Sequence, residues 1–277
     1  MKYEEVSKSV VFAQNEYGAN LVCIALENEL IFVEAGLHTV IAANFRKAME
    51  AKFNRKASTL LLSHSHIDHF FGMDAFSDLK VVAAEAGKLR FERIVNAEFT
   101  EEIIENFSRV FPHFRESVEV AKPFLPNVWV QDKMILGEEN QQVVFQVVGG
   151  HSGCSSSIHY VPDGVMIVGD LVQVDLYPYF GEPDTDIEKW IHALKTWESM
   201  DIKAVLPGHG KFVTKDYLLG VRTFFEGMLA TLKELKAEGV PIEEVIHHSN
   251  LPSGYWGKDA IRKPPYDMSI ANLYKKL

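Results

Sequence analysis

An apolar run leads directly into three histidines and an aspartate in the segment Leu60-Leu-Leu-Ser-His64-Ser-His66-Ile-Asp68-His69. Neutral imidazole nitrogens and a carboxylate oxygen are suitable ligands for a borderline ion such as Zn²⁺. His64 and His66 alternate, so both side chains can point the same way in an extended segment, whereas Asp68 and His69 follow after a turn. This spacing predicts a metal site, and it fits two neighbouring ions better than one.

Three further candidate ligands each follow an apolar, β-rich run: His151, Asp170 and His209. The runs cover residues 143–148, 165–168 and 204–206. The segment HSHIDH resembles the HxHxDH motif of the metallo-β-lactamase superfamily. The later residues stand in GGHSGCSS, MIVGDL and LPGHG, in the order expected for that family. The complete set is far more specific than closely spaced histidines alone.

The resemblance extends from about residue 9 to about residue 215 and implies an α+β fold, a four-layer αββα sandwich with metals at one edge between the sheets. By correspondence, one ion would be held by His64, His66 and His151, and a second by Asp68, His69 and His209, with Asp170 bridging both. Asp68 would also be catalytic, accepting a proton or orienting water. The expected cofactors are two divalent ions per chain, zinc in the first place, although iron and manganese accept the same ligands.

Two adjacent cations lower the pKa of a shared water, so that a metal-bridging hydroxide is available near neutral pH. We therefore predict a metal-dependent hydrolase of a small ester-like substrate: a lactone, a thioester or a related carbonyl compound. The alternative is an iron-dependent oxygenase or redox enzyme such as a sulfur dioxygenase. The redox branch of the family typically has a glutamate where this chain has His66, which favours hydrolysis. A phosphodiesterase is a weaker alternative.

Aromatic residues near the motif are candidate substrate contacts. Phe70 could wall an apolar pocket beside the ions, or it could only pack against the following helix. Tyr177 and Tyr179 follow Asp170 closely, and a phenol can donate a hydrogen bond to a developing oxyanion, although surface packing would also explain them. At the end of an early strand the family usually has an aspartate that supports the metal loop. Here Glu34 keeps the charge on a longer arm, which leaves that support open.

Composition limits the possible partners. The net charge is −10, with 38 acidic and 28 basic residues, which disfavours binding of a nucleic acid. We find neither a signal-peptide h-region nor an apolar run of the roughly 20 residues that a membrane span requires, so we expect a cytoplasmic protein without membrane contact. Two cysteines, Cys23 and Cys154, are too few for a disulfide framework. A homodimer is possible, but the sequence does not specify the oligomeric state.

The chain is predicted to form one domain over residues 1–277, with a helical insertion at about 98–126 and a helical C-terminal extension at about 215–277. Strands are expected at 9–13, 21–26, 29–33, 59–62, 80–84, 128–130, 134–136, 143–148, 157–160 and 165–168. Helices are expected at 39–51, 98–111, 187–200, 215–236, 242–247 and 268–276. Asp184 and Asp186 are expected to cap the helix that begins at Ile187.

Overall fold

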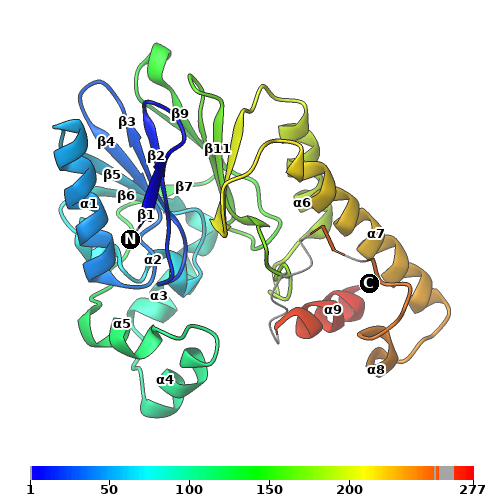
Figure 1. Cartoon of the computed structure of the whole chain (residues 1–277). Helices are drawn as coiled ribbons and strands as arrows, with labels where there is room; N and C mark the ends of the chain where they lie inside the picture. The colour runs from blue at the N-terminus through cyan, green and yellow to red at the C-terminus, as the bar shows by residue number, and fades with distance from the viewer. Residues whose placement is uncertain (1, 253, 256–264) are drawn as a thin grey trace.

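Two β-sheets form the centre of the fold, and helices cover their outer faces (Figure 1). The computed structural model describes residues 2–252, 254–255 and 265–277. The first sheet contains, in spatial order, β1 (Lys2–Glu5), β2 (Val10–Gln14), β3 (Leu21–Ala25), β4 (Leu30–Val33), β5 (Ala57–Leu61), β6 (Lys80–Ala84) and β7 (Val128–Val130). Its strands pair antiparallel from β1 to β4 and parallel from β4 to β7.

The second sheet has the spatial order β12 (Ala204–His209), β11 (Val165–Gln173), β10 (Ser156–Tyr160), β9 (Val143–Val147) and β8 (Lys133–Leu136). Only the β11–β12 pair is parallel among these strands. Alternation along β11 shows why the sheet is covered on both sides. Val165 and Ile167 enter the core between the sheets, whereas Met166 and Val168 face the outer helices.

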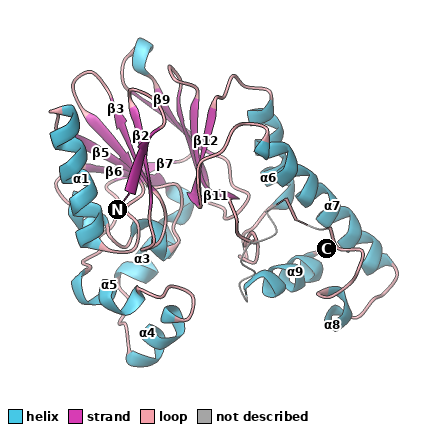
Figure 2. Ribbon diagram, in the orientation of Figure 1, coloured by secondary structure: helices cyan, strands magenta, loops and turns pink. Residues whose placement is uncertain are grey.

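The helices form the outer layers, as Figure 2 shows by colour. They are α1 (Thr39–Phe53), α2 (Ile67–Phe70), α3 (Lys88–Val95), α4 (Glu101–Ser108), α5 (Phe114–Val120), α6 (Ile187–Glu198), α7 (Tyr217–Ala237), α8 (Ile242–Val245) and α9 (Pro265–Lys276). Helix α1 packs Ala42, Phe45 and Met49 onto the first sheet. The described residues therefore confirm the predicted α+β sandwich of two sheets between helical layers.

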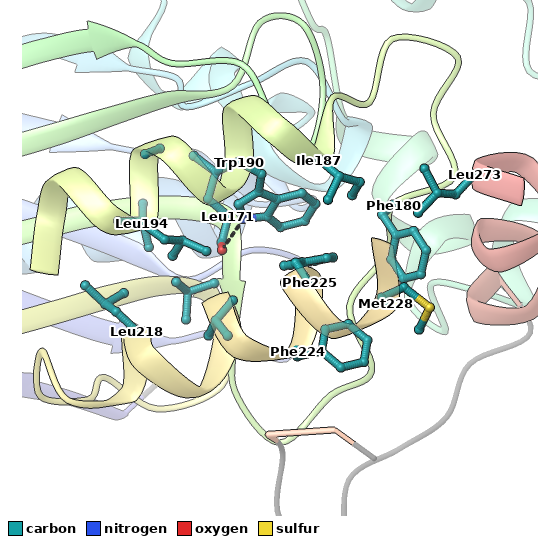
Figure 3. Close-up of a cluster of buried hydrophobic side chains, with 14 of the residues drawn as sticks. Leu171, Phe180, Ile187, Trp190, Leu194, Leu218, Phe224, Phe225, Met228 and Leu273 are labelled. Atoms are coloured by element: carbon teal, nitrogen blue, oxygen red, sulfur yellow. Dashed lines mark hydrogen bonds between the residues drawn. The ribbon is translucent and has the colours of Figure 1, made fainter. Parts of the chain in front are cut away.

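Helices α6 and α7 cover the second sheet through a large aromatic and aliphatic cluster (Figure 3). In α6, Ile187, Trp190 and Leu194 recur at helical spacing and are buried. The Trp190 ring lies 4.3 Å from the Phe225 ring between their centroids, and its indole N–H donates to the carbonyl oxygen of Leu171 at 2.9 Å (Figure 3). This contact ties α6 to the strand that carries Asp170.

The structure differs from the predicted elements in several places, and neither β1 nor the short helix α2 was predicted. The expected helix at 98–111 is shorter, and α5 follows it after Pro112 and His113. Helix α3 was not predicted, because it buries only Phe91 and exposes most of its other residues. Strand β11 continues past residue 168 to Gln173, so Asp170 lies within the strand and not after it.

The predicted insertion contains α4 and α5, and the predicted C-terminal extension contains α7, α8 and α9. Residues 253 and 256–264 of that extension lie outside the described residues. Figure 1 shows the α4–α5 pair and α9 at the same lower end of the molecule. The division into one domain with two additions stays a prediction. In the part of the chain that the structure describes, no helix is long and apolar enough to cross a membrane.

Candidate metal centre

All seven predicted ligands meet at one edge of the two sheets. Strand β5 ends at Leu61 and leads into the histidine motif, while β9 leads into His151. In the second sheet, parallel pairing places Gln173 of β11 beside His209 at the end of β12, so Asp170 lies close to that histidine. The sequence order of the ligands is thus converted into a spatial cluster by the strand register.

Two glycines allow this close approach. A Cβ atom at Gly208 would lie 2.1 Å from Asp170 Oδ1, and one at Gly169 would lie 2.2 Å from Ser63 Oγ. Gly169 also has a φ of +51°, which a side chain would disfavour. The backbone can therefore hold Asp170 against the histidine loop only with glycine at these positions.

The first group of candidate ligands contains His64, His66, His151 and Asp170. Each offers one ligand atom, and these atoms all lie within 4.8 Å of one another. His66 Nδ1 lies 3.1 Å from His151 Nε2, which lies 3.8 Å from Asp170 Oδ2. The group thus joins three imidazoles and one carboxylate, a donor set suited to zinc.

The second group contains Asp68, His69 and His209. His209 Nε2 lies 3.1 Å from Asp68 Oδ2, and His69 Nε2 lies 3.2 Å from Asp170 Oδ1. His209 Nε2 is also 3.5 Å from this same oxygen of Asp170. One oxygen of Asp170 therefore faces the first group and the other faces the second.

Hydrogen bonds fix the orientation of two of the imidazoles. His151 Nδ1 donates to the carbonyl oxygen of Tyr179 at 2.8 Å, and a carbonyl can only accept. His66 Nε2 lies 2.8 Å from Glu182 Oε1 and donates to that carboxylate. The opposite nitrogens, His151 Nε2 and His66 Nδ1, are then left with lone pairs that face the cluster.

Several buried polar atoms of the cluster make no hydrogen bond within the described residues. They are His64 Nε2, both ring nitrogens of His69, Asp170 Oδ1 and Glu34 Oε1. Four of these atoms face one another, with His69 Nδ1 3.1 Å from Glu34 Oε1 and His69 Nε2 3.2 Å from Asp170 Oδ1. His64 Nε2 has neither a hydrogen bond nor such a contact among the described residues, which costs about 1–3 kcal/mol. A bound cation would satisfy nitrogen and carboxylate donors together, so the residues fit a metal centre.

The ionisation states of most of the ligands suit a cation. Burial holds the pKa of His64 well below its usual value and lowers that of His151 to about 4, so both imidazoles are neutral, as metal ligands must be. Burial alone would raise the pKa of Asp68, but His69 and His209 outweigh it and lower this pKa to about 2. For Asp170, His209 and His69 likewise outweigh burial and lower the pKa, so both carboxylates stay charged. At His69 burial would lower the pKa, but the carboxylates of Asp170, Glu34 and Asp68 hold it well above its usual value, so a bound cation would have to replace that proton.

Glu34 contacts the metal loop from the end of β4. Its side chain is 2% exposed, and its backbone has a φ of 64°, which is uncommon outside glycine. Glu34 Oε1 lies 3.1 Å from His69 Nδ1, and Oε2 accepts from the N–H of Ser63 at 3.3 Å. The longer side chain thus contacts Ser63, just before the histidine motif, and His69 at its end. These contacts are the ones that Glu34 needs in order to support the metal loop.

A cavity of ≈ 480 Å³ opens beside the cluster, and Asp68, Asp170 and His209 are among the residues that line it. Tyr177 and Tyr179 line it too, as their predicted role in substrate binding requires. Phe70 does not. The structure places it in the apolar core, 4.7 Å from the Phe91 ring between centroids, because the short helix α2 turns this side chain away from the ligands.

Sequence reasoning missed three polar residues beside the cluster: Gln173, Glu182 and Arg90. Gln173 Nε2 donates to Asp170 Oδ2 at 2.8 Å, and its position three residues after Asp170 was a usable signal. Arg90 Nη2 donates to Glu182 Oε2 at 2.9 Å. Asp186 caps α6 as predicted, whereas Asp184 accepts from the N–H of Gly153 and from Arg90.

Comparison with known proteins agrees with this geometry. The family model described as the metallo-beta-lactamase superfamily matches residues 17–209, which contain all seven candidate ligands. The chain belongs to the metallo-β-lactamase superfamily. Among curated proteins, the comparison of sequences found no match.

Solved structures share the fold of this superfamily member at low sequence identity. A metallo-beta-lactamase from Pontibacter korlensis superposes with a TM-score of 0.62 at 15% identity, over 81% of this chain and 98% of that one. The stereoselective inverting sec-alkylsulfatase Pisa1 from Pseudomonas sp. superposes with a TM-score of 0.72 at 17% identity. That match covers 98% of this chain but 49% of the sulfatase, so this chain spans about half of its length. Members of the superfamily are mostly metal-dependent hydrolases, and this chain has a candidate site for divalent metal.

Proposed function

We propose that this protein is a dinuclear hydrolase, with zinc as its metal, that cleaves an ester-like carbonyl substrate such as a lactone or thioester. The observation that carries the proposal is the position of Asp170 between the two ligand groups, with Oδ2 3.8 Å from His151 and Oδ1 3.2 Å from His69. A carboxylate placed this way favours two ions over one. His66 supports hydrolysis, because the redox branch of the superfamily typically has a glutamate at this position.

The side chains then divide the work of hydrolysis. When bound, the two cations supply a hydroxide from water near neutral pH and polarise the acceptor oxygen. Asp68 lines the cavity, where its charged carboxylate orients the attacking water. Gln173 holds Asp170 in its bridging orientation. No nucleophilic serine or cysteine is required.

The cavity favours a substrate with an apolar group beside its carbonyl. Its volume of ≈ 480 Å³ is within the range of about 300–1,000 Å³ that is usual for small-molecule sites. Apolar and aromatic side chains line it from both additions and from the loop after β11: Phe107, Val110, Phe111, Tyr177, Tyr266 and Met268. Arg90 is already paired with Glu182 and Asp184, so its charge is balanced within the cavity wall.

Tyr179 contributes a protonated phenol to this cavity. Burial and the neighbouring Glu182 carboxylate raise its pKa to about 12. The phenol therefore keeps its proton near neutral pH, and Tyr179 is proposed as a substrate contact that donates a hydrogen bond to the oxyanion.

A panel of substrates tests the proposed reaction. Zinc-loaded protein is assayed with a p-nitrophenyl ester, a lactone, a thioester and a phosphodiester, before and after treatment with a chelator. We expect turnover of the carbonyl esters that disappears with the metal and returns when zinc is added. Phosphodiester turnover alone would overturn the substrate class. Oxygen consumption by an iron-loaded sample, without any hydrolysis, would overturn the reaction and favour an iron-dependent oxygenase.

A further inference from the structure

Residues 179–186, which we call the bracing segment, contact both loops that carry histidines of the first ligand group. Besides the bond from His151 to Tyr179, the Thr185 hydroxyl donates to the carbonyl oxygen of His151 at 2.8 Å. The N–H of Asp186 donates to the carbonyl oxygen of Gly150 at 2.8 Å. The His151 loop is therefore held along its backbone by this segment.

Glu182 of the bracing segment reaches the other loop with its side chain. Its two oxygens have different partners: Oε1 accepts from His66 Nε2 at 2.8 Å, and Oε2 accepts from Arg90 Nη2 at 2.9 Å. The side chains of Glu182 and His66 are only 18% and 17% exposed, so water competes weakly for these bonds. Arg90 also donates to Asp184 Oδ1 at 3.2 Å, which fixes its guanidinium between two carboxylates.

We propose that Glu182 is a positioning residue for the first metal ion. By accepting the Nε2 proton of His66, it selects the tautomer with a free Nδ1 lone pair and turns that nitrogen toward His151 and Asp170. Arg90 keeps the Glu182 carboxylate in place and charged. The inference rests on the proposed metal centre, but it concerns residues that lie outside the predicted ligand set.

The chemistry of imidazole explains why such a partner matters. A histidine ring can rotate and can carry its proton on either nitrogen, so an unsupported ligand binds metal only from part of its conformations. A carboxylate acceptor removes this freedom and raises the basicity of the metal-facing nitrogen. Loss of a partner of this kind typically costs about 10- to 100-fold in metal affinity.

The backbone of the bracing segment has its own attachments, which separate positioning from folding. Helix α9 holds the segment at three points: Ser269 Oγ accepts from the N–H of Phe180 at 3.1 Å, Asn272 Nδ2 donates to the carbonyl oxygen of Gly181 at 2.9 Å, and Lys276 Nζ donates to that of Glu182 at 2.8 Å. None of these bonds uses the Glu182 carboxylate. Truncating that side chain should therefore leave the segment in place.

The test compares metal affinity in Glu182→Ala, Glu182→Gln and a control, Glu188→Ala. Glu188 is a side chain on α6 with 76% exposure whose ion pair is with Lys233 at 3.4 Å. Each protein is titrated with Zn²⁺ against a chromophoric chelator, and its Co²⁺ absorption spectrum is recorded at one and two equivalents. His66→Ala serves as the reference for loss of the first ion.

We expect Glu182→Ala to lower the affinity for one of the two ions by about 10- to 100-fold and to give a Co²⁺ spectrum that resembles that of His66→Ala. Glu182→Gln keeps an acceptor for His66 but turns an amide N–H toward Arg90, so its affinity should lie between alanine and wild type. Glu188→Ala should match wild type. Wild-type affinity for both ions in Glu182→Ala, or equal weakening of both, would overturn the positioning role. Failure of the wild type to bind metal would instead reject the proposed centre itself.

Discussion

The two ligand groups are supported by different parts of the chain. His66 and His151 of the first group are held by the bracing segment, which belongs to the second half of the sequence. The second group is held by residues from the first half of the sequence. There the N–H of Ala19 donates to the carbonyl oxygen of Asp68 at 2.9 Å, and Asn20 Nδ2 donates to the carbonyl oxygens of Pro207 and Gly210 on either side of His209.

Burial differs between the two supports as well. Glu34 and His69 on the second side are 2% and 0% exposed, whereas Glu182 and His66 on the first side retain 18% and 17% exposure. Water cannot readily replace a partner in the fully buried Glu34–His69 pair, whereas it can reach the partly exposed Glu182–His66 pair. We infer that binding of the two proposed ions can be weakened one at a time. Asp170 links the two groups, and so does the contact of the His64 and His69 rings, whose centroids lie 4.0 Å apart.

The largest effect is expected for Asp170→Ala, which removes the carboxylate common to both groups. Both ions should bind weakly. The activation free energy of ester hydrolysis should rise by several kcal/mol, so the rate should fall on the order of 10³-fold or more. Elemental analysis and kcat/KM are the measurements. Retention of two ions with an unchanged rate would show that Asp170 does not bridge.

Loss of the first metal ion alone is expected for His66→Ala. One ion should remain, because Asp68, His69 and His209 are unchanged, and the rate should fall on the order of 10²-fold or more. Zinc stoichiometry at equilibrium checks the count, with His192→Ala on α6 as a histidine control away from the cluster. If His66→Ala lost both ions, the two sides would not be separable.

A smaller effect, on the affinity for the second ion, is expected for Glu34→Gln. The amide keeps the length of the arm but loses the charge beside His69, so affinity for the second ion should fall about tenfold while the first ion is unaffected. Separate zinc titrations of this variant and of Glu182→Ala would sharpen the comparison. Loss of all metal would mean that Glu34 supports both groups.

The smallest effect is expected for Phe111→Ala in the cavity wall. Removing this ring should raise KM for an ester with an apolar group by roughly fivefold, about 1 kcal/mol, while kcat and metal content stay constant. Leu89→Ala is the matched control, because Leu89 is 81% exposed and does not line the cavity. A fall in kcat with unchanged KM would argue against a binding role.

The candidate ligands were predictable from sequence because strands deliver them in a fixed order. Each donor stands at or near the end of an apolar run, and chain order carries that information. Glu182 was not predictable, since it lies in a loop without periodicity and its partner His66 is 116 positions away. Phe70 was misplaced because a single helical turn decides whether a residue faces the ligands or the core.

Anomalous diffraction at the zinc edge, from crystals of zinc-loaded wild-type protein, tests the central claim most directly. We predict two peaks per chain: one within about 2.0–2.2 Å of donor atoms from His64, His66, His151 and Asp170, and one at the same distance from Asp68, His69, His209 and Asp170. A single peak, or peaks that do not share Asp170, would contradict the dinuclear centre.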